Sequence, residues 1–178
     1  GFNNQDGANN VFVGNLAGFS NTGGDSSIYI GNRSGYRNTT GNTNVFIGNR
    51  AGYNNQFGFS NVFMGNQAGF SNISGNYNVL IGYRSGYNNK SNFNTFMGYM
   101  SGSGNDFGTY NVFLGYQAGL GNTDGSYNVF IGNMTGNVNA GGDYGLFIGH
   151  QSGFSSTGDN NILLGYQSGY SNSTGYDN

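Results

Sequence analysis

The nine residues Asn44-Val45-Phe46-Ile47-Gly48-Asn49-Arg50-Ala51-Gly52 contain the pattern that decides the fold. Three apolar residues precede a glycine, and a second glycine follows four residues after the first. This glycine pair returns ten times in the 178 residues, every 17 residues except for two steps of 16. A fixed period in phase along the whole chain predicts a stack of equivalent coils, because one unit alone cannot bury its apolar face. The pairs are Gly14/Gly18, Gly31/Gly35, Gly48/Gly52, Gly65/Gly69, Gly82/Gly86, Gly98/Gly102, Gly115/Gly119, Gly132/Gly136, Gly149/Gly153 and Gly165/Gly169.

Each unit has the composition of one short strand followed by turns. The β-branched and aromatic residues before the first glycine favour a strand, and the Gly, Asn, Ser, Thr and Asp that follow favour corners. No window has the 3.6-residue period of a helix. The sequence therefore predicts an all-β parallel β-solenoid, a β-roll or β-helix of about ten coils of 17 residues and roughly 48 Å in length. We expect residues 1–178 to be a single repeat domain that begins and ends in mid-repeat within a longer repetitive chain.

Composition excludes several classes of partner. The chain has 36 Gly, no Pro, Cys or Trp, and a net charge of −2, with only 7% of residues charged. Without a basic face it is not expected to bind nucleic acid, and without an apolar run of ~20 residues it is not expected to span a membrane. The absence of Cys excludes disulfides and thiolate metal sites.

The strands carry apolar residues on both faces. Side chains alternate along a strand, so Val45 and Ile47 point to one side and Phe46 to the other. A coil of 17 residues does not have room for both sets, and we expect the central, mostly aromatic column to point outward as a self-association stripe of about 1,000 Å². Such a stripe predicts that the chain packs on itself in a trimer, bundle or filament. Its residues are Phe12, Tyr29, Phe46, Phe63, Leu80, Phe96, Phe113, Phe130, Phe147 and Leu163.

Asparagine recurs in two columns of the repeat, and stacked amides can hydrogen bond along the axis of a narrow coil. We predict a structural role for both columns. The first comprises Asn21, Asn38, Asn55, Asn72, Asn89, Asn105, Asn122, Asn139 and Asn172. The second comprises Asn10, Asn44, Asn61, Asn78, Asn94, Asn111, Asn128 and Asn161.

No set of residues has the pattern of a catalytic, cofactor or metal site. His150 is the only histidine, Glu is absent, and the seven Asp residues are scattered near corners. Calcium at these corners is not favoured, because the glycine-rich calcium repeats have a shorter period and an Asp in each unit. A solenoid enzyme that cleaves polysaccharides would need paired carboxylates, which the scatter of Asp does not provide. We therefore expect a protein that is not an enzyme and needs no cofactor.

The stretch Asn111 to Gly119, NVFLGYQAG, resembles the NTFIGYQAG units of bacterial and phage tail-fibre-like proteins. The strand followed by Ala-Gly or Ser-Gly is also similar to the head repeats of trimeric autotransporter adhesins, although the repeats here are longer. The resemblance implies a left-handed β-roll at a cell surface, outside the cell or in a phage virion. The primary hypothesis is the structural shaft of a self-associating extracellular fibre. The alternative is a carbohydrate-binding adhesin that holds surface glycans with outer Tyr, Asn and Arg ladders.

Overall fold

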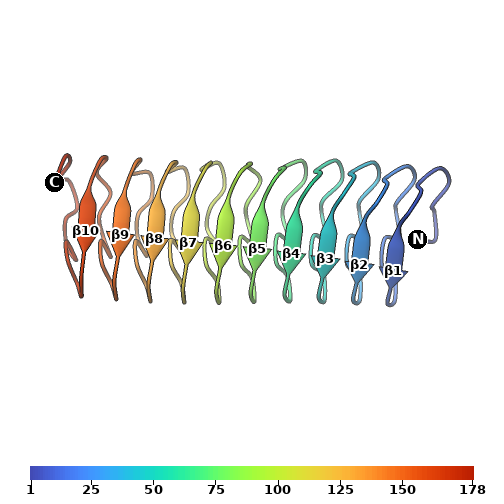
Figure 1. Cartoon of the computed structure of the whole chain (residues 1–178), viewed down its shortest axis with the longest axis horizontal. Coiled ribbons are helices and arrows are strands. Elements are labelled where there is room, and N and C mark those ends of the chain that lie inside the picture. Colours follow the sequence, from blue (N-terminus) through green and yellow to red (C-terminus); the bar gives the residue numbers. More distant parts are fainter.

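A computed structural model describes all 178 residues as a rod of stacked coils with no helix (Figure 1). Ten strands of three residues form one parallel sheet in the order β1 to β10. The strands are β1 (Val11–Val13), β2 (Ile28–Ile30), β3 (Val45–Ile47), β4 (Val62–Met64), β5 (Val79–Ile81), β6 (Thr95–Met97), β7 (Val112–Leu114), β8 (Val129–Ile131), β9 (Leu146–Ile148) and β10 (Ile162–Leu164). The predicted parallel β-solenoid is confirmed.

Equivalent residues of successive coils lie beside each other along the whole rod. Phe46 pairs with Phe63 across β3 and β4, one period apart. The strands also stay in register where the period shortens to 16 residues, as Leu80 pairs with Phe96. The strands of Figure 1 lie on the near side and point downward, while successive coils advance from right to left. This combination makes the coil left-handed, in agreement with the resemblance.

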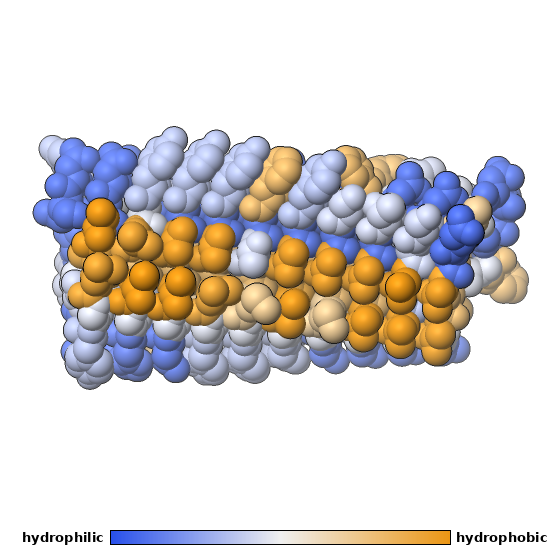
Figure 2. All heavy atoms as spheres, in the orientation of Figure 1, coloured by the Kyte–Doolittle hydropathy of each residue, from blue (hydrophilic) through white to orange (hydrophobic).

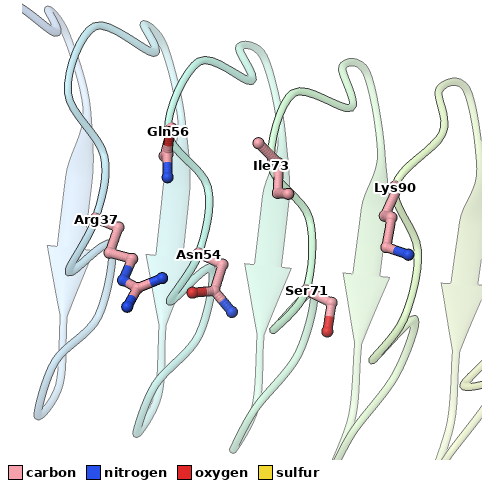
Figure 3. Close-up of a pocket in the computed structure, with 6 residues that line it drawn as sticks. All are labelled: Arg37, Asn54, Gln56, Ser71, Ile73 and Lys90. Carbon is pink, nitrogen blue, oxygen red and sulfur yellow. The ribbon is translucent and has the colours of Figure 1, made fainter.

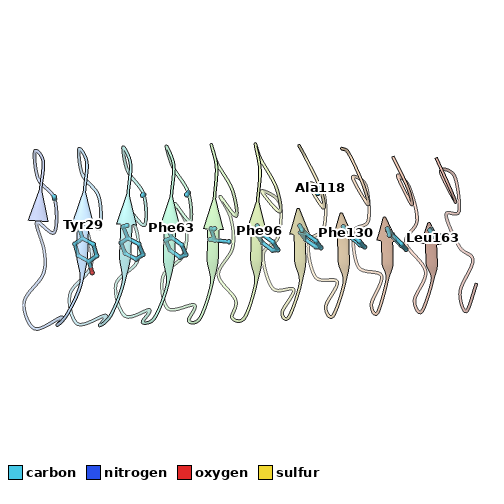
Figure 4. Close-up of a cluster of buried hydrophobic side chains, with 13 residues drawn as sticks. Tyr29, Phe63, Phe96, Ala118, Phe130 and Leu163 are labelled. Atoms are coloured by element: carbon cyan, nitrogen blue, oxygen red, sulfur yellow. The ribbon is translucent and has the colours of Figure 1, made fainter. Parts of the chain in front are cut away.

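The core contains the column that the sequence analysis placed outside, and that prediction is wrong. The aromatic rings of the proposed self-association stripe point into the coil and stack on one another (Figure 4). Ring centroids in this column lie 4.6 to 5.1 Å apart. Eight of its ten members are fully buried, Leu163 is buried at 8% exposure and Phe12 is half-buried. These residues are Phe12, Tyr29, Phe46, Phe63, Leu80, Phe96, Phe113, Phe130, Phe147 and Leu163.

The physical reason is the width of the coil. The wall opposite the strand is made of Ala, Ser or Thr and the second glycine of each pair, which leaves space for one large side chain per coil. A Cβ atom added at Gly119 would lie 2.4 Å from the ring of Phe113. A Cβ atom at the first glycine, Gly115, would lie 2.2 Å from the carbonyl oxygen of Gly132 in the next coil. Both glycines also have positive φ, so the pair is needed for close approach and for backbone conformation.

The first asparagine column is a buried ladder, as predicted. The column members from Asn21 to Asn139 have no solvent exposure, and several of their amides bond to an amide of a neighbouring coil. Asn38 donates to Asn55 at 3.1 Å, and Asn122 donates to Asn105 at 2.7 Å. Several members also donate to the carbonyl group three residues later within their own coil.

The second asparagine column joins consecutive coils at two points. The Oδ1 atom of Asn111 accepts the backbone N–H of Asn128 in the next coil at 2.9 Å. Its Nδ2 atom donates to the carbonyl oxygen of Gly125, in the turn that precedes that strand, at 2.7 Å. Asn44, Asn61 and Asn94 repeat this geometry. Because 95 of the 113 backbone hydrogen bonds lie outside the strands, the turns hold the coils together as much as the sheet does.

Two corners of each coil differ from the sequence expectation. The residues two before each strand and three after it have φ near 55°, yet many are Tyr, Arg, Gln or Met rather than Gly or Asn. Examples are Tyr127 with φ 61° and Gln117 with φ 52°. The stacking of coils fixes this backbone whatever residue occupies the corner, and each bulky residue there costs about 1–2 kcal/mol.

Candidate interaction surface

The outward side of the sheet is an apolar face that runs the length of the rod. It consists of the first and third residues of every strand, which lie on either side of the buried central column. Figure 2 shows them as two adjacent rows of hydrophobic side chains. The apolar face contains Val11, Val13, Ile28, Ile30, Val45, Ile47, Val62, Met64, Val79, Ile81, Thr95, Met97, Val112, Leu114, Val129, Ile131, Leu146, Ile148, Ile162 and Leu164. Thr95 is the only polar member.

The apolar face is solvent-accessible in the isolated chain. Met64 and Met97 near the middle are 37% and 42% exposed, and Leu164 in the last strand is 59% exposed. Nine strand intervals of ~4.8 Å and two side-chain rows give a footprint on the order of 600 Å². The largest contiguous apolar patch of a typical soluble monomer is about 300–600 Å², so the apolar face lies at the upper end of this range. The sequence analysis predicted the exposed apolar surface in the central column of each strand. In the structure this surface is formed by the two columns beside it.

Polar or aromatic columns border the apolar face on both sides. The residues two before and two after each strand border the apolar face, and many of them are exposed, as Tyr77, Tyr110 and Tyr116 are. The upstream border is Asn9, Ser26, Thr43, Ser60, Tyr77, Phe93, Tyr110, Tyr127, Tyr144 and Asn160. The downstream border is Asn15, Asn32, Asn49, Asn66, Tyr83, Tyr99, Tyr116, Asn133, His150 and Tyr166. The upstream border was not predicted, although the run of aromatic residues at this position of the repeat would have identified it.

The borders change character along the rod. In the first four coils both borders contain only Asn, Ser and Thr, whereas aromatic residues dominate from the coil of β5 onward. The aromatic members stack on each other, as Tyr110 does on Tyr127 with ring centroids 5.0 Å apart. Tyr99 and Tyr116 stack in the same way on the downstream border at 5.2 Å. The second half of the apolar face therefore has aromatic residues along both borders, interrupted at Asn133 and Asn160.

Stacking determines what these aromatic rings can contact. Consecutive rings are nearly parallel, with interplanar angles of 5° for Tyr110 and Tyr127 and 7° for Tyr99 and Tyr116. The neighbouring coils therefore cover much of each ring face, and ring edges and hydroxyl groups face the solvent. A sugar ring that stacks on an aromatic side chain needs an open ring face. This geometry disfavours the Tyr ladders as stacking platforms for glycans.

Charge is divided between the two halves of the rod. Residues 1–90 contain all five Lys and Arg and two Asp, a net charge of +3. Residues 91–178 contain five Asp and no Lys or Arg, a net charge of −5. The rod is therefore electrically polarised along its axis, with its positive half coinciding largely with the Asn- and Ser-bordered part of the apolar face.

A small hollow lies beside the first asparagine ladder, away from the strands (Figure 3). Its volume is about 250 Å³, below the 300–1,000 Å³ usual for small-molecule pockets. It is lined by Arg37, Asn54, Gln56, Ser71, Ile73 and Lys90. Lys90 already forms an ion pair with Asp106 at 2.7 Å, and Arg37 lies 5.8 Å from the ring centroid of Tyr53. The hollow offers two cations and several polar groups to an anionic or hydroxylated ligand.

No three His or Asp side chains lie close enough together to hold a metal ion. His150 stacks on Tyr166 at 5.3 Å in the downstream border, as its place in the repeat implied. No helix has the length and hydropathy needed to cross a bilayer.

No protein-family profile, curated protein or solved structure matches the chain.

Proposed function

We propose that the chain is the structural shaft of an extracellular fibre or filament that self-associates through its apolar face. The carrying observation is the continuous apolar face, which is half-exposed in the isolated rod. Removing such a surface from water contributes about 25 cal/mol per Å², and the flat rows of a sheet suit face-to-face packing at ~10 Å. A rod held by ladders of backbone, amide and ring contacts is mechanically stiff, which suits a shaft.

The resemblance to tail-fibre-like and adhesin head repeats supports the finer part of the proposal. From it we infer that the shaft belongs to a cell-surface adhesin, an appendage or a phage tail fibre, outside the cell or in a virion. Phe46 and its equivalents point into the coil, so they take no part in contacts between chains.

Sedimentation velocity over a concentration series tests self-association. We expect the native chain to sediment as an oligomer, and Ile81→Lys and Leu114→Lys to shift it toward monomer, because each buries an unpaired charge in the interface. The matched control is Asn88→Lys, which adds the same charge to an exposed column that already contains Arg37. A native chain that stays monomeric at 100 µM or more, or a control that dissociates as readily as the two variants, would contradict the proposal.

A carbohydrate-binding adhesin is the second candidate. The hollow between Arg37 and Lys90 favours it, since cations beside amide and hydroxyl groups can bind the carboxylate or sulfate of an acidic sugar. Glycan-array binding that is lost in Arg37→Ala and Lys90→Ala but retained in Arg50→Ala would support this candidate. Absence of binding to acidic glycans would remove it.

A further inference from the structure

We propose that two copies of the chain pair antiparallel across the apolar face, so that the first half of each rod lies on the second half of its partner. This inference rests on the proposed self-association and adds its orientation. The observations that carry it are the borders of the apolar face and the division of charge, both of which change near the middle of the rod.

The borders are more complementary in size in an antiparallel pair than in a parallel one. A two-fold axis along the strand direction places the coil of β9 opposite the coil of β2 and joins like borders. Tyr144 then lies opposite Ser26 of the second copy, Tyr127 opposite Thr43 and Tyr110 opposite Ser60. Aromatic residues meet one another only in the two middle coils, where the aromatic border residues of β5 and β6 face each other.

A parallel pair lacks this fit. A two-fold axis along the rod places each coil opposite the same coil of the second copy and joins the upstream border to the downstream border. Phe93 would then meet Tyr99, and Tyr110 would meet Tyr116, aromatic against aromatic. In the first four coils Asn and Ser would face Asn across a gap. Poor packing of this kind forfeits the dispersion contacts that a dry interface needs.

Charge favours the same orientation. An antiparallel pair places the half with net charge +3 against the half with net charge −5, whereas an in-register parallel pair places like charges together. None of the charged residues belongs to the apolar face itself, so salt screens their effect over a Debye length of about 8–10 Å. The charges therefore favour the antiparallel over the parallel orientation, while burial of the apolar face supplies most of the free energy of association.

The area is sufficient for a specific pair. The four outward columns span six residue intervals of ~3.3 Å, and nine strand intervals of ~4.8 Å give a footprint of roughly 860 Å² per chain. A standard specific interface buries about 800 Å² per partner. The interface would have an apolar centre and a rim of Tyr, Asn and Ser, the usual anatomy of such contacts.

Distances between spin labels on two copies test the orientation. The chain has no Cys, so Asn32→Cys and Asn66→Cys each provide one thiol, on the exposed downstream border of the coils of β2 and β4. In the antiparallel pair the two labels at position 32 are seven coils apart along the axis, about 34 Å, and those at position 66 are three coils apart, about 14 Å. We therefore expect a much longer separation at position 32.

Equal separations at the two positions would overturn the inference. Parallel chains in register place the two labels on opposite borders of the face, about 20 Å apart at both positions, and a stagger along the rod lengthens both separations equally. Sedimentation of the labelled chains shows whether they still associate. A monomeric native chain would refute the proposed self-association itself, whereas an oligomer with equal separations refutes only the orientation.

The salt dependence of the unlabelled chain provides a second test that needs no variant. The antiparallel pair brings opposite charges together, so we expect its dissociation constant to rise several-fold between 20 and 150 mM salt. A dissociation constant that falls over this range would indicate that like charges face each other and would contradict the antiparallel pair.

Discussion

Tyr29 is the one polar member of the buried core column, and Tyr29→Phe should stabilise the rod. The side chain has no solvent exposure, and its hydroxyl oxygen has no hydrogen-bond partner. An unsatisfied buried polar group costs about 1–3 kcal/mol. The ring stacks on Phe12 and Phe46, and Phe retains these contacts. We expect Tyr29→Phe to raise the free energy of unfolding by about 1–2 kcal/mol at neutral pH.

The phenol also makes stability depend on pH. Burial raises the pKa of Tyr29 to about 12. The polar side chains of Ser27 and Asn44 lie near enough to the phenol to oppose this rise, but neither has the geometry of a hydrogen bond with the hydroxyl, so the hydroxyl is unsatisfied. Because the folded pKa lies above the unfolded value of about 10, this stabilising term is complete below pH 10 and is lost as pH rises through 12. Two pKa units correspond to about 2.7 kcal/mol, so the native chain should lose up to this much more than Tyr29→Phe between pH 10 and 12.

Urea unfolding at pH 7 and at pH 11.5 measures both effects. Tyr53→Phe is the control, since Tyr53 stacks in an outer aromatic column and is partly exposed. If Tyr29→Phe leaves stability unchanged at pH 7, or if the two variants behave alike at pH 11.5, the hydroxyl is not buried without a partner and the placement of this column in the core is wrong.

Three further substitutions test the ladders and corners by urea unfolding. Asn111→Ala should cost about 2–4 kcal/mol, because it leaves the buried backbone N–H of Asn128 unpaired and removes one of the two side-chain hydrogen bonds to the Gly125 carbonyl, whereas the exposed Asn133→Ala should cost less than about 0.5 kcal/mol; equal losses would argue against the ladder. Gly119→Ala should cost about 2–5 kcal/mol, from positive φ and from overlap with a core ring, and a loss below 1 kcal/mol would show that the coil is wider than described. Gln117→Gly should stabilise by about 0.5–1 kcal/mol because it relieves a φ of 52°, while Gln56→Gly, at a residue without positive φ, should destabilise; stabilisation by both would contradict the corner geometry.

Much of the fold follows from the sequence. The period of the glycine pairs predicts the length and number of the coils, and the apolar triplets predict the strands. The constant position of the Asn columns within the repeat predicts buried ladders. These features are predictable because each coil repeats the same local chemistry. A residue that departs from the pattern in one coil does not obscure it, since the other nine coils show the pattern.

The orientation of the strand was not predictable from the same pattern. Alternation shows that Phe46 and its two neighbours point to opposite sides, but both sides are apolar, so hydrophobicity does not say which side is inside. The volume of the interior decides, because the coil holds one large ring per turn opposite Ala51 and Gly52. The site residues predicted for self-association were therefore wrong, while the expectation of an exposed apolar column applies to the residues beside them.

Methionine oxidation tests the central claim most directly, since the four Met residues lie in two environments. Met64 and Met97 belong to the apolar face, whereas Met100 and Met134 occupy corner positions outside it. If the apolar face is covered by another copy, oxidation of Met64 and Met97 by hydrogen peroxide should slow as protein concentration rises, relative to Met100 and Met134. Oxidation rates of all four that stay in constant proportion from dilute to concentrated protein would contradict the account.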